Sequence, residues 1–251
     1  MIDQTLNIRH IEEIGMSALP ALHTLYYDGW VLRFAGGHTR RANSVNALYP
    51  STLDLDEKIA TCEALYHDQG LPAVFKMTDS VCPSDLDALL AARGFEAVSP
   101  TSVMVADLTN FDSPPPGVTH IDPRRSPHWL GSYARMNEVS PQKRDLLGQM
   151  LDALISPTGY AAIEQDGEIV TVGLAVVTQG YVGLFDIVTA PSLRKQGLGR
   201  RLVHDLLGWG QSQGGHHAYL QVVAANAPAV HLYEQFGFYE AYRYWYRVRN
   251  R

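Results

Sequence analysis

The six residues Arg194-Lys195-Gln196-Gly197-Leu198-Gly199 constrain the fold of this chain more than any other stretch. An apolar run, Tyr181 to Val188, precedes them and an amphipathic run, Arg201 to Gln213, follows, which predicts a strand, a glycine-bearing turn and a helix. Glycine lets backbone N–H groups approach a ligand closely, and at a helix N-terminus these groups are unsatisfied and lie at the positive end of the dipole. The stretch therefore predicts a pyrophosphate-binding cradle, beside which Arg200 and Arg201 supply further cations.

The composition is that of a globular protein without a membrane span. The chain has 251 residues, of which 46% are hydrophobic, and no apolar run of about 18 residues occurs. The N-terminus shows no basic segment followed by an apolar core, so we expect no secretory signal and a cytoplasmic location. Cys62 and Cys82 suit neither a disulfide framework nor a metal site, so no bound metal is expected. The net charge of −6 argues against nucleic acid as a partner.

Residues 1–110 read as helices and strands around a hairpin. Residues 5–25 are predicted to form a helix, and Trp30–Ala35 and Asn43–Tyr49 are predicted to form strands that turn at Gly36-Gly37. Three arginines decorate this hairpin: Arg33, Arg40 and Arg41. A solvated hairpin face is the expected role of these arginines, and a contact with an anion or substrate is the alternative.

Residues 111–117, with three consecutive prolines, read as a linker between a first domain at residues 1–110 and a second at residues 118–251. The first domain continues after the hairpin with a predicted helix, strand, helix and strand at Leu55–Gln69, Ala73–Met77, Pro83 to Gly94 and Val98–Val105. The helices predicted in the second domain are Pro127–Met136, Pro141–Ile155, Arg200–Gln213 and Asn226–Phe236. Its predicted strands are 118–122, Tyr160–Glu164, Ile169–Val177, Tyr181–Thr189, Ala218–Val223 and Phe238–Arg247.

A second motif follows the cradle in the second domain: Asn226-x-x-Ala229-x-x-Leu232-Tyr233, then Gly237-Phe238. Arg194-x-x-Gly197-x-Gly199 alone is a weak signal, but the two motifs in these elements resemble the GNAT superfamily of acyl-CoA-dependent N-acetyltransferases. The resemblance covers about residues 118–251. It implies an α/β (α+β) fold with a central mixed, mostly antiparallel, twisted sheet flanked by helices. It also implies that acetyl-CoA, as a co-substrate, lies where two parallel strands splay.

The resemblance further implies which residues bind acetyl-CoA. Its pyrophosphate would lie against Arg194 and on the backbone N–H groups of Lys195, Gln196, Gly197, Leu198, Gly199 and Arg200. Its thioester carbonyl would accept a hydrogen bond from an N–H near Val188 or Thr189, which is an oxyanion-hole arrangement. Asn226 corresponds to the family's asparagine that contacts the cofactor arm, and the same residue suits a helix N-cap.

Direct attack of a primary amine on a thioester needs a base for the amine and an acid for the departing thiolate. Tyr233 matches the family's tyrosine that acts as general acid, and an ordinary pKa near 10 keeps its hydroxyl protonated at neutral pH. The base is less defined, because the strand Ala218–Val223 has Gln221 where many family members have a glutamate. Asp186 is our candidate, since an aspartate inside an apolar strand is costly without a partner or a role. Structural pairing of Asp186 and deprotonation through water are the alternatives.

The first domain repeats the spacing of the second. The spans Gly70 to Gly94 and Gly214 to Gly237 have nearly equal lengths, and each contains a strand, a helix and a Gly-Phe step. Where a cradle belongs, the first copy has Thr52 to Lys58, which is acidic and lacks glycine. We therefore expect tandem GNAT-like domains, the first of them degenerate, packed on the second and walling its acceptor pocket.

The acceptor is left open by the sequence. A small-molecule amine and a peptide, acetylated at its N-terminus or at a lysine, both suit the chemistry, and an oligomer is compatible with the sequence. A non-catalytic acyl-CoA-binding module is the rival class, against which the presence of Tyr233 and Asn226 argues. Glu138 lies in the region where early helices of the family flank the acceptor.

Overall fold

Apolar and aromatic runs of the chain form the strands of one sheet in the computed structural model, which describes residues 7–112 and 117–249. The first half contributes β1 (His23–Tyr27), β2 (Trp30–Phe34), β3 (Val45–Ala47), β4 (Val74–Thr78) and β5 (Glu96–Asp107). The second half contributes β6 (Thr119–Asp122), β7 (Thr158–Gln165), β8 (Glu168–Thr178), β9 (Tyr181–Thr189), β10 (His217–Val223) and β11 (Tyr239–Val248). These described strands are hydrogen-bonded in the order β1-β2-β3-β4-β11-β5-β10-β9-β8-β7-β6.

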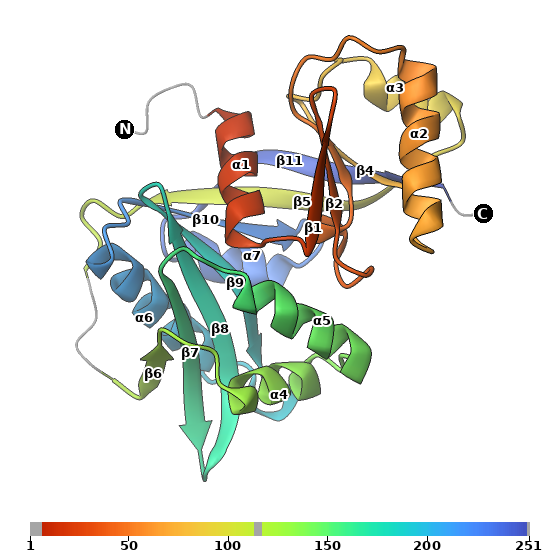
Figure 1. Cartoon of the computed structure of the whole chain (residues 1–251). Helices are drawn as coiled ribbons and strands as arrows, with labels where there is room; N and C mark the ends of the chain where they lie inside the picture. The colour runs from red at the N-terminus through yellow and green to blue at the C-terminus, as the bar shows by residue number, and fades with distance from the viewer. Residues whose placement is uncertain (1–6, 113–116, 250–251) are drawn as a thin grey trace.

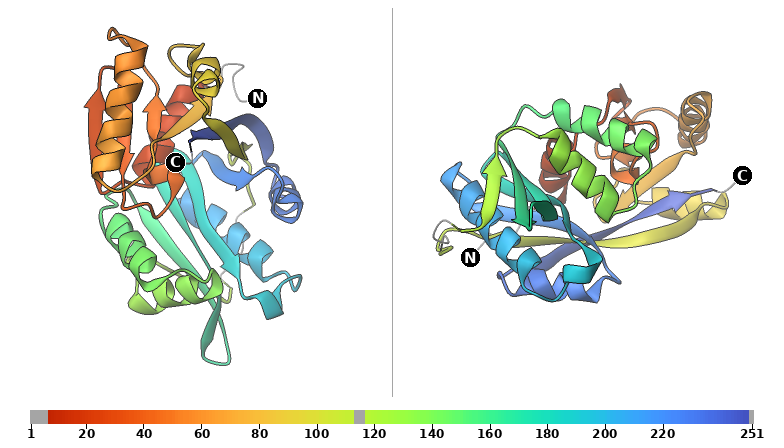
Figure 2. Two further views of the ribbon diagram at one scale, coloured as in Figure 1. Left: turned by 90° about the vertical axis from the view of Figure 1, so that its right-hand side faces the viewer. Right: turned by 90° about the horizontal axis from the view of Figure 1, so that it is seen from below.

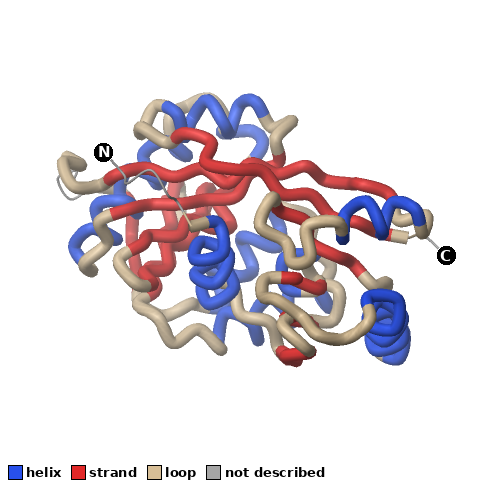
Figure 3. The backbone as a smooth tube through the Cα atoms, turned by 90° about the horizontal axis from the view of Figure 1, so that it is seen from above, coloured by secondary structure: helices blue, strands red, loops and turns tan. Residues whose placement is uncertain are grey.

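The two halves exchange their last strands. Strand β5 of the first half pairs antiparallel with β10, with Val103 opposite Gln221. Strand β11 of the second half lies between β4 and β5, with Tyr246 opposite Lys76. Figures 1 and 3 show β5 and β11 as long strands that cross the middle of the molecule and join its two ends. The sheet is therefore continuous through strands that each half supplies to the other.

The halves repeat one topology, as the sequence predicted. In each half a parallel strand pair is joined by a crossover helix: β3 and β4 through α2 (Leu55–Asp68), and β9 and β10 through α6 (Leu198–Ser212). A second helix then leads to the exchanged strand, α3 (Leu86–Ala92) in the first half and α7 (Ala227–Glu234) in the second. The expected α/β fold of tandem, mixed and mostly antiparallel sheet units flanked by helices is confirmed.

Helices cover both faces of the sheet in the second half. On one face lie α1 (Ile8–Ala18), α4 (Pro127–Met136) and α5 (Pro141–Asp152), and on the other lie α6 and α7 (Figure 2). Strand β5 follows the period of two, because Val103 and Val105 face the α1 side whereas Met104 and Ala106 face the α6 side. Since α1 comes from the first half, the apolar core under α1 contains residues from both halves.

The predicted helix over residues 5–25 is wrong in its length. The helix α1 begins after its N-cap Asn7 and ends at Ala18, shortly before Pro20, and His23–Tyr27 forms the edge strand β1. Proline disfavours helical geometry in the residue that precedes it, and this preference outweighs the apolar spacing. Residue 5 and the predicted prolines of the linker, residues 114–116, lie outside the described residues.

The expected solvated face of the first hairpin is also wrong for two of its three arginines. Arg33 is buried, and its guanidinium donates hydrogen bonds to the carbonyl oxygens of Met16 (3.1 Å), Leu19 and Arg41 (2.6 Å). Burial lowers the pKa of Arg33 to about 10. The Arg33 side chain holds the C-terminal end of α1, where helix carbonyl groups lack partners, against the hairpin. Arg41 lines a cleft, and Arg40 alone of the three is exposed.

Candidate active site

The stretch Arg194 to Gly199 forms an exposed, uncapped helix start. Lys195 has a φ of +63° and Gly197, the N-cap of α6, has a φ of +83°, a conformation that glycine adopts without strain. Among the described residues no side chain caps α6, so its first N–H groups have no side-chain acceptor there. A Cβ built on Gly197 would have no neighbouring atom within 4 Å, so there is open space beside these groups. An anionic group can therefore reach them.

The parallel strands β9 and β10 part beside this helix start. Their pairing ends at Leu184 opposite Leu220, although β9 continues to Thr189 and β10 to Val223. This is the splay that the family resemblance implied. It leaves the facing backbone groups at the ends of both strands without a neighbouring strand.

A bulge in β9 shapes the site at the splay. Opposite β8, the register moves from Leu174–Phe185 to Val172–Val188, and Asp186 within the bulge has a φ of +53°. Farther along, the N–H of Ala190 donates to Val170 O at 2.8 Å. Because directions alternate along an antiparallel ladder, the N–H of Val188 also faces β8, whereas that of Thr189 faces the splay.

Asp186 is held by one hydrogen bond and leaves one oxygen free. The Tyr133 hydroxyl of α4 lies 3.3 Å from Asp186 Oδ1 and donates to it. The second oxygen, Oδ2, is buried and has no hydrogen-bond partner in the described part of the chain. Burial raises the pKa of the Asp186 carboxyl, and the nearby Arg41 and the Tyr133 hydrogen bond offset part of this effect. The pKa therefore moves toward the range in which a general base operates.

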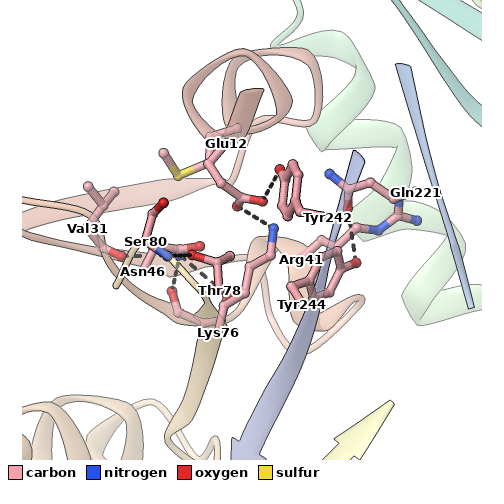
Figure 4. Close-up of polar contacts among 12 residues, drawn as sticks. Glu12, Val31, Arg41, Asn46, Lys76, Thr78, Ser80, Gln221, Tyr242 and Tyr244 are labelled. Carbon is pink, nitrogen blue, oxygen red and sulfur yellow. Dashed lines mark hydrogen bonds and ion pairs between the residues drawn. The ribbon is translucent and has the colours of Figure 1, made fainter. Parts of the chain in front are cut away.

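A cleft of about 440 Å³ lies between the two halves, and Asp186 is one of the residues that line it. The first half lines it with Leu19, His38, Thr39 and Arg41, and the second half with residues that include Tyr133, Asn137 and Lys143. Figure 4 shows the Arg41 side chain beside Gln221 and Tyr244, whose hydroxyl donates to Gln221 Oε1 at 3.0 Å. Gln221 is the first residue of β10 beyond its pairing with β9, so the cleft adjoins the splay.

The second motif brings Asn226 and Tyr233 to α7. Asn226 is the N-cap of α7 and accepts a hydrogen bond from Ala229 N at 3.3 Å, which confirms the capping role. Tyr233 is 9% exposed and packs edge-on against Phe238, with ring centroids 5.9 Å apart. Burial raises its pKa to about 12, so the phenol stays protonated at neutral pH. Its hydroxyl has no hydrogen-bond partner among the described residues.

Two residues of this site, Tyr133 and His38, were not found from the sequence, and Arg41 was found only through the alternative role of its hairpin. Tyr133 lies on a predicted helix with no distinguishing motif around it. Arginines on a hairpin ordinarily lie on a solvated face. The alternative, a contact with an anion or substrate, requires that Arg41 lie off that face. The pair Gly36-Gly37 before it signals an irregular loop, and this loop carries Arg41 into the cleft.

Comparisons with known proteins agree with this geometry. The Bacillus subtilis protein named "Uncharacterized N-acetyltransferase YobR" is 28% identical over 252 residues, which span 97% of this chain and 99% of that protein. The structure of a GCN5-related N-acetyltransferase from Kribbella flavida matches with a TM-score of 0.69 at 13% identity, over 97% of this chain and 95% of its own. A tandem GNAT protein from the clavulanic acid biosynthesis pathway matches with a TM-score of 0.62 at 11% identity, over 96% and 88%.

The start of α6 is open and lies beside the point where the parallel strands β9 and β10 separate. Together with these similarities, this geometry defines the class: the protein is an N-acetyltransferase of the GNAT superfamily with tandem domains. The sequence model described as "Probable histone acetyltransferase Rv0428c C-terminal" matches residues 5–247, and the chain belongs to that family.

Two kinds of feature are absent from the described residues. Within residues 7–112 and 117–249, no helix has both the length and the apolar character needed to cross a bilayer. Over the same ranges, no three His, Cys, Asp or Glu side chains are grouped so that they could hold a metal ion.

Proposed function

We propose that this protein transfers an acetyl group from acetyl-CoA to a primary amine by direct attack in a ternary complex. One observation carries the proposal: the uncapped start of α6, the splay of β9 and β10 and the free oxygen of Asp186 adjoin one another. The first suits a pyrophosphate, the second suits a pantetheine arm, and the third suits an ammonium group. In this order they connect the α6 face of the sheet to the cleft between the halves.

Acetyl-CoA supplies an activated acetyl group as a thioester. The residues that we expect to bind it are Val188, Thr189, Arg194, Lys195, Gln196, Gly197, Leu198, Gly199, Arg200, Asn226 and Tyr233. Among the two backbone candidates for the carbonyl oxygen, strand alternation favours the Thr189 N–H over that of Val188, which faces β8. Asn226 keeps its side-chain NH₂ group for the cofactor arm, because its oxygen caps α7.

Proton transfer is assigned to Asp186 and Tyr233. The Asp186 carboxylate removes a proton from the acceptor ammonium, and the neutral nitrogen then forms the new C–N bond as the C–S bond breaks. The nitrogen loses its second proton as the amide forms, and this proton restores the phenol of Tyr233 after it has protonated the departing thiolate. Tyr233 donates its proton to the departing sulfur, which a phenol with a raised pKa can do at neutral pH. If this assignment holds, Asp186→Asn flattens the acidic limb of the pH–rate profile, whereas an unchanged limb would assign the deprotonation to water.

Calorimetry with acetyl-CoA, followed by detection of released CoA thiol with a library of amines and peptides, tests the function. The variant Gly199→Glu places a carboxylate at the cradle, where a Cβ meets only Thr189 Oγ1 at 3.5 Å, so the fold tolerates it. Its matched control is Gly131→Glu on α4, an exposed position with open space around the Cβ. We expect loss of acetyl-CoA binding in the first variant only.

Two outcomes count against the proposal. Absence of acetyl-CoA binding by the parent protein at millimolar concentration would overturn it. Binding without thiol release for every amine and peptide would assign the protein to non-catalytic acyl-CoA-binding modules instead. Mass spectrometry of the products identifies the acceptor class and distinguishes small amines from peptides.

A further inference from the structure

Two opposite charges line the cleft without bonding to each other, and each leaves hydrogen-bonding groups without a partner among the described residues. The Arg41 guanidinium makes no hydrogen bond or ion pair within residues 7–112 and 117–249, and Asp186 Oδ2 has no partner there either. Both side chains line the same 440 Å³ cleft. The two charges attract each other across the cleft, and this attraction favours the lower pKa of Asp186 and the higher pKa of Arg41. A charge sheltered from water without a partner is costly, so this arrangement is one that a ligand would complete.

The segment that carries Arg41 is built to hold it in place. The Asn43 side chain accepts hydrogen bonds from the N–H groups of Ala35 (2.8 Å) and Gly37 (2.9 Å) and donates to Thr39 O at 2.8 Å. Arg33 donates to the carbonyl oxygen of Arg41 itself at 2.6 Å. These bonds fix the loop before a ligand arrives, which lowers the entropic cost of binding.

The other charged groups near the cleft leave this pair dominant. Lys143 and Glu138 also line the cleft, but both are exposed, so water screens their charges. His38 also lines the cleft, and burial together with Lys143 and Arg41 lowers its pKa, so its ring is neutral at neutral pH. The interior of the cleft therefore presents one cation and one anion.

We propose that the acceptor is a small zwitterion with a primary amine and a carboxylate, such as a free amino acid. This inference rests on the proposed acetyl transfer. The ammonium binds Asp186 Oδ2 beside the splay, where it is deprotonated, and the carboxylate binds the Arg41 guanidinium. A planar guanidinium suits a carboxylate because it can donate two parallel hydrogen bonds. A cleft of 440 Å³ holds a molecule of this size.

Steady-state kinetics with pairs of acceptors tests the inference. Each of the common amino acids is compared with its amide and with the amine that lacks the carboxyl group, at saturating acetyl-CoA. For the parent enzyme we expect kcat/KM to be at least about tenfold higher for acids than for their partners. Arg41→Met should lower kcat/KM for the acids by at least about tenfold and leave the amides within about twofold, because it removes only the carboxylate contact.

Three controls separate this result from a structural defect. Arg40→Met changes the neighbouring, exposed arginine, which does not line this cleft, and should leave every acceptor unchanged. Arg41→Lys should restore part of the preference for acids. Thermal unfolding of each variant establishes that it is folded.

The failure of this inference differs from the failure of the proposed function. Acids and amides acetylated equally well by the parent, or lowered equally by Arg41→Met, would overturn the zwitterion while acetyl transfer stands. If no acceptor is acetylated, calorimetric binding of the amino acids in the presence of CoA decides. Binding of acids but not amides, lost in Arg41→Met, supports the inference, and binding of neither overturns it.

Discussion

The starts of α2 and α6 occupy equivalent places in the two halves and differ in what satisfies their N–H groups. In the first half, Asp54 caps α2 and accepts hydrogen bonds from Asp56 N (2.9 Å) and Glu57 N (3.1 Å). In the second half, Gly197 is the N-cap of α6, and no side chain within residues 7–112 and 117–249 bonds to the first turn. The same crossover topology therefore produces a closed helix start in one half and an open one in the other.

The loop before α2 also binds an anion of the protein itself, Asp28, which lies in the turn between β1 and β2. The Asp28 carboxylate accepts from the N–H groups of Thr52 and Leu53, each at 2.9 Å, and forms an ion pair with the buried Lys58 at 3.1 Å. The backbone hydrogen bond from Leu53 is the main cause that holds the pKa of Asp28 far below its usual range. A carboxylate thus fills the position that we assign to a phosphate in the other half. Loss of a ligand site can therefore be a change of partner with the fold retained.

The largest expected effect concerns the residue of the first half that corresponds to Tyr233. The aligned Gly-Phe steps place Leu90 at that position, and Leu90 is fully buried beside Phe75 and Leu86. Leu90→Ala should lower the free energy of unfolding by about 3 kcal/mol, because it leaves a cavity, without changing the affinity for acetyl-CoA. Denaturant unfolding and calorimetry measure the two quantities. A weakened cofactor affinity in this variant would break the division between a structural and a catalytic half.

A substitution that gives α6 the cap of α2 has the next largest effect. Gly197→Asp supplies a carboxylate that competes for the first N–H groups and repels a pyrophosphate, so the Kd for acetyl-CoA should rise about 100-fold, or about 2.7 kcal/mol. Gly197→Asn is the control, because it has the same shape and backbone strain without the charge, and its loss should be smaller. Equal affinities of both variants and the parent, measured by calorimetry, would show that the open start of α6 does not bind the cofactor.

The third largest effect is expected from removal of the Tyr233 hydroxyl, the group that distinguishes Tyr233 from Leu90. Tyr233→Phe should lower kcat about 30-fold at unchanged acetyl-CoA affinity, a modest loss for an acid because a thiolate is a good leaving group. Pre-steady-state measurement of CoA release is the test. A kcat equal to that of the parent would show that Tyr233 is not the general acid, and Tyr233 and Leu90 would then not differ in catalytic role.

The smallest effect is on stability and concerns the strained bulge of the second half. The folded-state pKa of Asp186 is raised, so the folded protein binds its proton more tightly than the unfolded chain does. The ionised carboxyl therefore destabilises the fold increasingly as the pH rises from about 3.9, the ordinary value, through the folded pKa. Asp186→Asn should raise the Tm at neutral pH, and this gain should vanish as the pH falls toward 4. A gain that is constant with pH would point to the bulge geometry and not to the charge.

The sequence predicted the individual elements around this site better than it predicted how these elements pack together. The glycine-bearing start of α6, the repeat and the helix that carries Tyr233 were predicted from the sequence because each depends on residues close together in the chain. The exchange of β5 and β11 was not predicted from the sequence, because alternation along a strand indicates which face is buried but not which strand lies beside it. Burial of Arg33 was not predicted, and a contact of Arg41 with a ligand was held only as an alternative, for a related reason: the surroundings of both residues are contributed by α1, β9 and β11.

The exchanged strands also constrain the order in which the molecule can assemble. Strand β4 finds its partner β11 at the far end of the chain, with Val74 opposite Val248. During synthesis from the N-terminus, β4 and β5 thus emerge long before β11, so the two edges that pair with β11 stay unsatisfied until the end of the chain is made. Contacts of such long separation slow folding, since loop closure precedes the gain from pairing. The tandem halves are therefore expected to fold as one cooperative unit on the completed chain, and not one after the other.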